Sequence, residues 1–157
     1  MIPDIPVKRF DRPDARAEAL AVAIMSDAFD PYYGEAWTPQ QLSAFTLLPG
    51  VNLSIAQLDG ATLGFALTRQ VVDEVELMLL AVARSWQGKG IGKLLVNHCI
   101  AAARRNGGKI LHLEVRANNS AISFYDSLGF EYVHRRPSYY KGTDGATFDA
   151  LSYRLEI

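Results

Sequence analysis

Residues 87–92 have the types and spacing that bind a phosphate group through the polypeptide backbone. Their sequence is Gln-Gly-Lys-Gly-Ile-Gly, and they stand between an apolar segment and a segment with helical periodicity. Glycines let backbone N–H groups approach an anion without an intervening side chain. A helix N-terminus adds roughly half a positive charge where such donors converge. The segment therefore predicts an anion site, to which Lys89 can add a cation.

The spacing of these glycines separates the segment from two common phosphate motifs. Gly88-x-Gly90-x-Gly92 differs from the Gly-x-Gly-x-x-Gly pattern of dinucleotide-binding folds. No Gly-Lys-Ser/Thr follows four residues after a first glycine, so the segment is not a P-loop. By itself the turn is explained equally well as a strand–helix connection that binds no ligand. Its interpretation depends on the elements that surround it.

Those elements predict a mixed α/β fold in one domain spanning residues 1–157. Residues 77–82 are apolar on both faces of a strand, as in the centre of a sheet, and Asp59-Gly60 is typical of a hairpin turn. Thr38, Pro39 and Gln41 predict a capped helix start. The expected strands cover about 7–10, 52–57, 62–69, 75–82, 109–116, 130–134 and 146–156. The expected helices cover about 14–29, 38–48, 90–106 and 119–128, and residues 135–145 are expected to be irregular.

The composition favours a protein that works in a reducing compartment without a membrane or a nucleic acid partner. The net charge is −1, which argues against a basic nucleic-acid-binding face. Neither a signal peptide nor a membrane-spanning run is evident in the sequence. The one cysteine, Cys99, lies in an apolar helical stretch and is expected to be a buried structural thiol. We therefore expect a cytoplasmic monomer or homodimer.

A second motif gives the glycine turn a specific interpretation. Residues 118–130 read Asn-Asn-Ser-Ala-Ile-Ser-Phe-Tyr-Asp-Ser-Leu-Gly-Phe. This segment and Gln87-x-x-Gly90-x-Gly92 resemble the two signatures of the GNAT acetyltransferases. Within that family, residues 113–118 and 135–140 resemble strings of the bacterial ribosomal-protein-alanine N-acetyltransferases. The resemblance implies a mixed central sheet of about six to seven strands flanked by about four helices, with acetyl-CoA as co-substrate.

The resemblance also implies which residues bind acetyl-CoA. The backbone of the strand at 80–82 is expected to hold the pantetheine arm, because strand edges offer free donors and acceptors. The backbone of residues 87–93 is expected to hold the pyrophosphate, and Asn118 the lower part of the arm. The expected coenzyme-binding residues are Leu80, Ala81, Val82, Gln87, Gly88, Lys89, Gly90, Ile91, Gly92, Lys93, Asn118, Ser120 and Tyr125.

Direct transfer of an acetyl group to an amine requires that the amine lose a proton. Glu114, on one face of the strand at 109–116, is the first candidate base, and Glu76 on the neighbouring strand is the second. Either glutamate can instead be an ordinary exposed strand residue. Tyr125 is the candidate acid for the departing thiolate, since the pKa of tyrosine, about 10, is not far from that of a thiol. His112 is expected to be structural, and the histidine spacing predicts no metal site.

Aromatic residues in two predicted loops are candidates for binding the amine substrate. In the N-acetyltransferases that this chain resembles, these two loops flank an acceptor peptide. The candidates are Tyr32, Tyr33, Trp37, Tyr139 and Tyr140. A surface aromatic cluster or a dimer contact explains them equally well. Three functions stay open at this point: acetylation of a peptide or protein N-terminus, acetylation of a small-molecule amine, and a non-catalytic module that binds acetyl-CoA.

Overall fold

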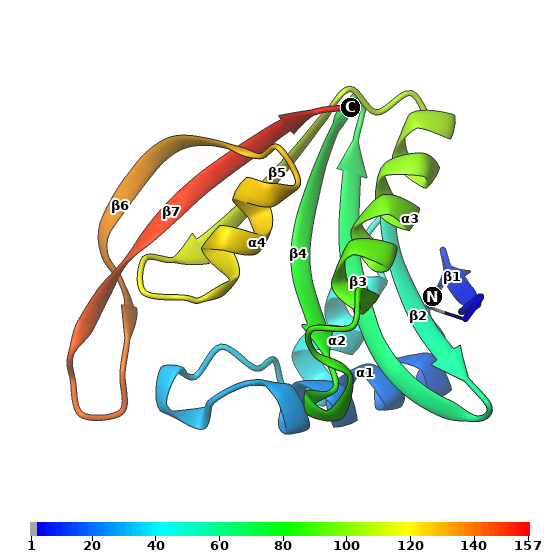
Figure 1. Ribbon diagram of the computed structural model, residues 1–157, viewed down its shortest axis with the longest axis horizontal. Coiled ribbons are helices and arrows are strands. Elements are labelled where there is room, and N and C mark those ends of the chain that lie inside the picture. Colours follow the sequence, from blue (N-terminus) through cyan, green and yellow to red (C-terminus); the bar gives the residue numbers. More distant parts are fainter. Residues whose placement is uncertain (1–2) are drawn as a thin grey trace.

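Seven strands form one mixed sheet across residues 3–157, which are the residues that the computed structural model describes (Figure 1). The strands are β1 Val7–Phe10, β2 Val51–Leu58, β3 Ala61–Val71, β4 Glu74–Val82, β5 Ile110–Arg116, β6 Glu131–Lys141 and β7 Thr147–Glu156. Their order in the sheet is β1-β2-β3-β4-β5-β7-β6. Within residues 3–157, only the β4–β5 pair is parallel. The mixed α/β sheet expected from the sequence is confirmed.

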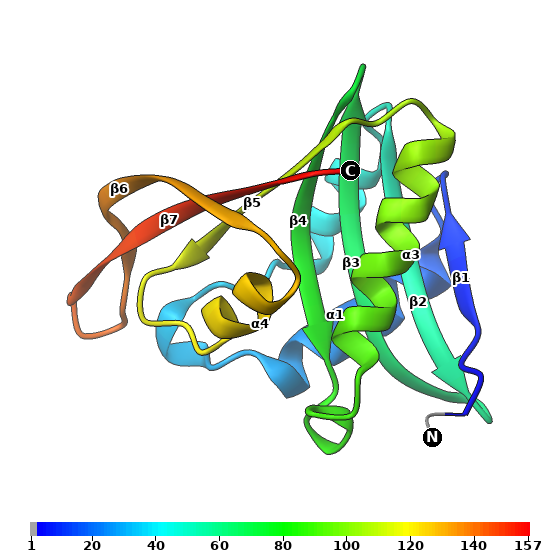
Figure 2. The same cartoon turned by 45° about the horizontal axis from the view of Figure 1, so that its top comes forward.

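Helices cover both faces of this sheet (Figures 1 and 2). The α-helices are α1 Ala15–Ala28, α2 Pro39–Thr46, α3 Ile91–Arg105 and α4 Ala121–Ser127, and two short 3-10 helices are η1 Pro31–Tyr33 and η2 Arg84–Trp86. One hydrophobic cluster lies between the sheet and α3 with α4, and a second lies between the sheet and α1 with α2. Among these described helices, none is long and apolar enough to span a bilayer.

Local sequence signals fix the ends of α1 and α2. The Asp14 side chain accepts a hydrogen bond from the Ala17 N–H and caps α1. Thr38 and Gln41 exchange side-chain and backbone hydrogen bonds at the start of α2, which is the expected capping box. The capping box of α2 thus fixes where the segment between α1 and α2 ends. That segment borders the cavities described below.

Glu18 joins α1 to α2 from a buried position. It is only 7% exposed, and its carboxylate accepts hydrogen bonds from the Ser43 and Thr46 hydroxyls and from the Asp14 N–H. Donors on both helices therefore converge on one carboxylate. Because the carboxylate is satisfied by several donors, its burial stabilises the packing of the two helices.

Replacing Glu18 by alanine is expected to lower the free energy of unfolding by about 1–3 kcal/mol. The substitution removes the acceptor of the part-buried Asp14 N–H and of the Ser43 hydroxyl, and it leaves the buried Thr46 hydroxyl with only the Ser43 carbonyl. Urea unfolding followed by circular dichroism measures the change. Glu131→Ala is the matched control because Glu131 is exposed, and it should change stability by less than about 0.5 kcal/mol. A loss below 1 kcal/mol for Glu18→Ala contradicts this account.

Strands β4 and β5 separate after a short paired stretch, and this opens the sheet. Pairing joins Glu74 to Ile110, Val75 to Leu111 and Glu76 to His112, and no pair follows within the described residues. Figure 1 shows the two strands meeting near one end and diverging toward α4. Residues 77–82 of β4 thus have no strand neighbour on the β5 side. The gap exposes backbone donors and acceptors in the middle of the sheet.

The structure corrects the expectation for residues 135–145. That segment was expected to be irregular, but β6 continues to Lys141 and pairs with β7 on both sides of an irregularity between Arg136 and Tyr140. Pro137 and Ser138 are atypical of strands, which hides the strand in the sequence. The strand persists because pairing with β7 resumes at Tyr140, opposite Phe148.

Cys99 lies inside the core between α3 and the sheet. It is 6% exposed, and burial raises the pKa of its thiol to about 11. A thiol with this pKa carries almost no thiolate at neutral pH and is a poor nucleophile. The expectation of a buried structural thiol is confirmed.

Candidate active site

The glycine turn between β4 and α3 presents backbone donors as the sequence predicts. Gly88 and Gly90 adopt the left-handed conformation, with φ of 75° and 88°. Residues other than glycine rarely adopt this conformation. Gly90 is the N-cap of α3, so no side chain occupies the donors of the first helical turn. The Gln87 side-chain amide donates to the Val82 carbonyl and fixes the turn against the end of β4. The backbone of the turn therefore has the form that an anion site requires.

A cavity of about 820 Å³ runs from this turn along the open edge of β4. The glycine turn lines it together with residues 80–82 of β4. Its walls include residues of the turn, of β4 and of α4: Leu80, Ala81, Val82, Trp86, Gln87, Gly88, Gly90, Ile91, Gly92, Lys93, Asn119, Ser120, Ala121, Phe124 and Tyr125. The combination of free N–H groups and an unpaired strand edge fits acetyl-CoA.

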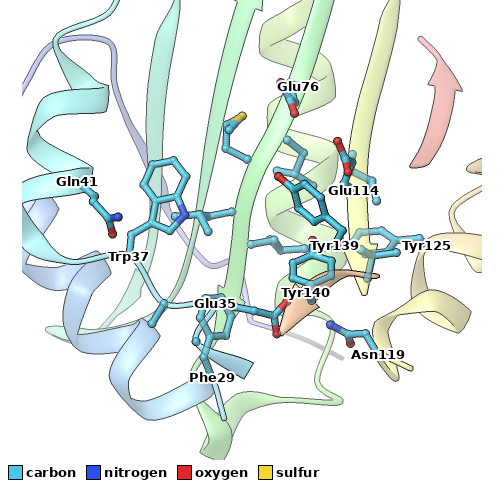
Figure 3. A pocket seen from close by; sticks show the side chains of 18 residues that line it. Phe29, Glu35, Trp37, Gln41, Glu76, Glu114, Asn119, Tyr125, Tyr139 and Tyr140 are labelled. Atoms are coloured by element: carbon cyan, nitrogen blue, oxygen red, sulfur yellow. The ribbon is translucent and has the colours of Figure 1, made fainter. Parts of the chain in front are cut away.

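A second cavity, of about 450 Å³, meets the first where β4 and β5 diverge. Figure 3 shows its polar side chains directed toward a common space below Glu76 and Glu114. Residues that line both cavities mark the junction, and they are Phe29, Glu35, Leu80, Asn119 and Tyr125. Two ligands entering from opposite sides of the sheet would meet at this junction.

Glu114 and Glu76 face the second cavity from β5 and β4. One carboxylate oxygen of Glu114 pairs with the Arg136 guanidinium at 3.0 Å, and the other is buried without a hydrogen-bond partner among the described residues. Burial and the charge of Glu114 raise the pKa of Glu76. Glu114 therefore has one carboxylate oxygen without a partner among the described residues, and Glu76 is the more exposed of the two glutamates.

Tyr125 is a buried residue of α4 at the junction of the two cavities. Burial, with a smaller contribution from Tyr140, raises its pKa to about 12. The phenol thus stays protonated throughout the physiological range. A pKa this far above that of a thiol favours hydrogen-bond donation to a departing sulfur over complete proton transfer.

The candidate substrate aromatics lie in three different places. Trp37, Tyr139 and Tyr140 line the second cavity, so they surround the space next to Glu114. Burial, with the charges of Glu35 and Glu114, raises the pKa of Tyr140 to about 12. Tyr33 borders the larger cavity instead. Tyr32 lines neither cavity, and its hydroxyl donates to Asp144 at 2.6 Å, which ties the loop to the β6–β7 hairpin.

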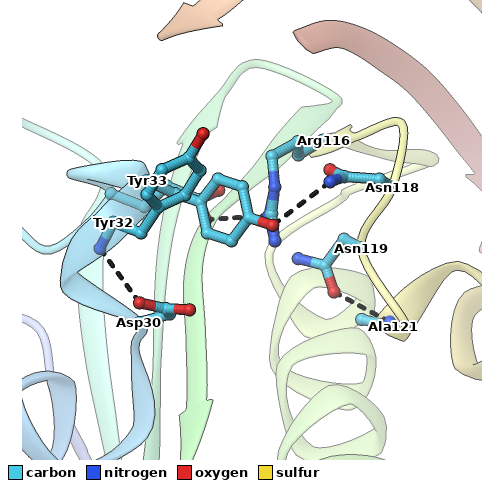
Figure 4. Close-up of polar contacts among 8 residues, drawn as sticks. Asp30, Tyr32, Tyr33, Arg116, Asn118, Asn119 and Ala121 are labelled. Carbon is cyan, nitrogen blue, oxygen red and sulfur yellow. Dashed lines mark hydrogen bonds and ion pairs between the residues drawn. The ribbon is translucent and has the colours of Figure 1, made fainter. Parts of the chain in front are cut away.

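A charged cluster at the junction was not predicted from the sequence. Arg116 is 7% exposed, pairs with Glu35 at 3.1 Å and lies over the Tyr33 ring at 3.4 Å (Figure 4). The Asn118 amide donates to the Tyr33 hydroxyl. These contacts bind the α1–α2 loop to the end of β5. The signal in the sequence was an arginine two residues after Glu114, on the same expected face of the strand.

Some expected coenzyme residues lie away from the cavity wall. Asn118 is exposed and engaged with Tyr33, whereas its neighbour Asn119 lines both cavities and accepts from the Ala121 N–H. The ammonium group of Lys89 stands over the Trp86 ring at 5.0 Å. His112 does not line this cavity and pairs with Glu74 at 3.6 Å. Roles for Asn118 and Lys89 in coenzyme binding stay predictions, and Asn119 is the amide that the structure places at the junction.

Gly88→Ala is expected to weaken acetyl-CoA binding about tenfold. A side chain at φ +75° costs roughly 1–2 kcal/mol, and the turn relaxes by moving the N–H groups that face the cavity. Gly107→Ala is the matched control, because Gly107 has φ +80° at the other end of α3 and equally open surroundings. Isothermal titration should show unchanged affinity for Gly107→Ala, although both variants lose stability. Equal affinities for the two variants contradict the assignment.

Comparison with known proteins gives the same interpretation as the geometry. Residues 22–130 match the Acetyltransferase (GNAT) family. The ribosomal protein bS18-alanine N-acetyltransferase of Escherichia coli strain K12 is 40% identical over 108 residues, which cover 68% of this chain and 72% of that protein. N-alpha-acetyltransferase RimI of Mycobacterium tuberculosis is 32% identical over 120 residues, covering 72% of this chain and 74% of that protein.

Solved structures show the same fold over almost the whole chain. The crystal structure of the ribosomal-protein-S18-alanine N-acetyltransferase from Escherichia coli has a TM-score of 0.83 at 30% identity, and the match covers 97% of this chain and 94% of that one. The structure of yncA from Salmonella typhimurium with its cofactor acetyl-CoA has a TM-score of 0.76 at 21% identity, covering 98% and 94%. The chain belongs to the GNAT acetyltransferase family and is an acetyl-CoA-dependent N-acetyltransferase.

Proposed function

We propose that this enzyme acetylates the N-terminal α-amine of a protein or peptide. The observation that carries the proposal is the junction of two cavities between β4 and β5, with Glu114 and Tyr125 beside it. One cavity offers a turn of backbone donors for acetyl-CoA, and the other is an open site with tyrosines and a tryptophan on its walls. The related enzyme of Escherichia coli is by name a ribosomal protein bS18-alanine N-acetyltransferase, and that of Mycobacterium tuberculosis is by name an N-alpha-acetyltransferase.

The residues at the junction suit direct transfer. The neutral amine bonds to the thioester carbonyl carbon, the carbon–sulfur bond breaks, and the nitrogen loses a proton. The free oxygen of Glu114 receives that proton, directly or through water. Tyr125 donates a hydrogen bond to the sulfur as negative charge develops on it. Glu76 stays the alternative base, because it lines the same cavity on the neighbouring strand.

The shape of the acceptor cavity supports a peptide in place of a compact small amine. Trp37 lies on the α1–α2 side, and Tyr139 and Tyr140 lie on the β6 side. Aromatic walls on both sides of an opening can hold an extended backbone, since tyrosines combine apolar contact with a hydroxyl group. A short chain can therefore place its first amine at the junction while its later residues leave between the two walls.

A matched pair of peptides tests the proposal. One peptide has a free N-terminal alanine and no lysine, and the other has the same sequence with a blocked N-terminus and one added lysine. Thiol release measures the rate and mass spectrometry locates the acetyl group. We expect acetylation of the free α-amine, with the blocked peptide at least about a hundredfold slower. Acetylation of only polyamines or aminoglycosides would replace this proposal with a small-molecule acceptor.

The same proposal extends to the domain organisation, the partner and the cellular compartment of the enzyme. We propose that residues 1–157 work as one domain, because the walls of the two cavities come from residue 28 through residue 140. A protein N-terminus is the proposed partner, with the enzyme acting in the cytoplasm, as the single buried cysteine suggests. Monomer and homodimer both stay open as predictions. The proposed chemistry calls for no metal ion.

A further inference from the structure

Strand β6 contains an insertion opposite a single residue of β7. Arg136 pairs with Ala150 and Tyr140 pairs with Phe148, so the three residues 137–139 lie opposite Asp149 alone. A regular antiparallel pair would place one residue there. The two extra residues form a bulge of the kind that redirects side chains near functional sites. We refer to residues 137–139 as the β6 bulge.

The β6 bulge determines which side chains reach the acceptor cavity. Successive residues of a regular strand point to opposite faces, yet Tyr139 and Tyr140 both line this cavity. Their rings pack edge to face at 5.1 Å, and the Arg136 guanidinium lies over the Tyr139 ring at 5.3 Å. Arg136 also pairs with Glu114. The β6 bulge thus places Tyr139, Tyr140 and Arg136, which is the ion-pair partner of Glu114, on the same side of β6.

Asp149 holds this distortion with both oxygens of its carboxylate. Its Oδ1 accepts from the Ser138 N–H at 2.9 Å, and its Oδ2 pairs with Arg135 at 3.3 Å. Ser138 has φ +53°, a conformation that a serine adopts only when its surroundings hold it there. The Asp149 carbonyl accepts from the Ala117 N–H at the end of β5. Asp149 therefore joins the β6 bulge to the strand that carries Glu114.

We propose that Asp149 is a positioning residue for the acceptor, which fixes the β6 bulge so that Arg136, Tyr139 and Tyr140 stand correctly against Glu114. The proposal rests on the acceptor site proposed above. Asp149 lines neither the coenzyme cavity nor the acceptor cavity, so it acts only through the residues that it holds. Its loss should weaken use of the acceptor and leave acetyl-CoA binding intact.

Three variants separate the contributions of the carboxylate. Asp149→Ala removes both contacts, and Asp149→Asn keeps an acceptor for the Ser138 N–H but removes the charge that faces Arg135. Arg135→Ala removes only the ion pair, which is half-exposed and should contribute little. Glu156→Ala is the matched control, because Glu156 is another β7 carboxylate paired with an arginine, at 3.7 Å, away from the cavity.

We expect Asp149→Ala to raise the KM of the acceptor about tenfold or more, with the Kd of acetyl-CoA unchanged within about twofold. Asp149→Asn should recover most of the loss, and Arg135→Ala and Glu156→Ala should stay within about threefold of the wild type. Steady-state kinetics with the best acceptor of the wild type, peptide or small amine, gives the KM, and titration gives the Kd. Because the best acceptor of the wild type is used, the test does not depend on whether the two peptides described above are acetylated.

Three results would overturn the inference. The first is an unchanged acceptor KM in Asp149→Ala, which would mean that the β6 bulge keeps its form without the carboxylate. The second is a parallel loss of acetyl-CoA affinity, which would indicate general loss of structure. If Asp149→Ala does not fold, Asp149→Glu serves in its place, since it keeps the charge and moves the oxygens by one methylene. A folded Asp149→Glu with normal acceptor KM also contradicts the role.

Discussion

Glu114→Gln is expected to lower kcat by about 10²–10⁴-fold while the Kd of acetyl-CoA stays unchanged. The amide cannot accept the proton of the attacking amine, but it keeps the shape of the carboxylate, and its oxygen can still accept from Arg136. The unpartnered oxygen of Glu114 lies in a buried position at the acceptor cavity, which is where a base must act. Steady-state thiol release and titration calorimetry measure the two quantities.

Glu76→Gln is the matched control for this variant. Glu76 lines the same cavity, carries the same functional group, and has a pKa raised by burial and by Glu114. We expect its kcat to fall by less than about tenfold, because its removal leaves the candidate base in place. A large loss for Glu76→Gln with a small loss for Glu114→Gln would exchange the two roles. Equally small losses would mean that neither carboxylate takes the proton.

Tyr125→Phe is the second large effect that we expect, with kcat lower by about 10²-fold. The substitution removes one hydroxyl from the junction of the cavities and leaves a ring of the same shape against Phe124 and Phe130. The acetyl-CoA affinity should change by less than about threefold, because the loss is confined to stabilisation of the departing sulfur. Tyr132→Phe, an exposed tyrosine of β6, is the control and should be neutral.

The pH dependence of kcat/KM distinguishes hydrogen-bond donation by Tyr125 from ionisation of its phenol. Burial keeps the pKa of Tyr125 and Tyr140 at about 12, so neither phenol ionises below pH 10. With a peptide acceptor, kcat/KM should rise through the pKa of the α-amine, about 8, and then stay level to pH 10. A fall between pH 9 and 10 that is absent from Tyr125→Phe would show that the tyrosine ionises in this range.

The sequence predicts those parts of the fold that depend on contacts between residues close together in the chain. The starts of α1 and α2 follow from Asp14, Thr38 and Gln41, whose side chains bond to the backbone three residues away. The glycine turn likewise depends on six neighbouring residues, among which Gly88 and Gly90 have positive φ angles. Such interactions fit within one short window, so composition and spacing identify them. Only the β6 segment was misjudged, because its pairing with β7 overrides the unfavourable Pro137 and Ser138.

The sequence by itself determined the family and the fold class, and it predicted the coenzyme turn and the roles of Glu114 and Tyr125. Only the tertiary structure decided how the acceptor side is built. The Arg116–Glu35 pair joins residues 81 positions apart, and the Asn118–Tyr33 contact joins residues 85 apart. Asp149 acts on β6 from the adjacent strand. No short window contains both partners of these contacts. They exist because the divergence of β4 and β5 brings distant segments to one opening, and the energy of sheet pairing selects that arrangement.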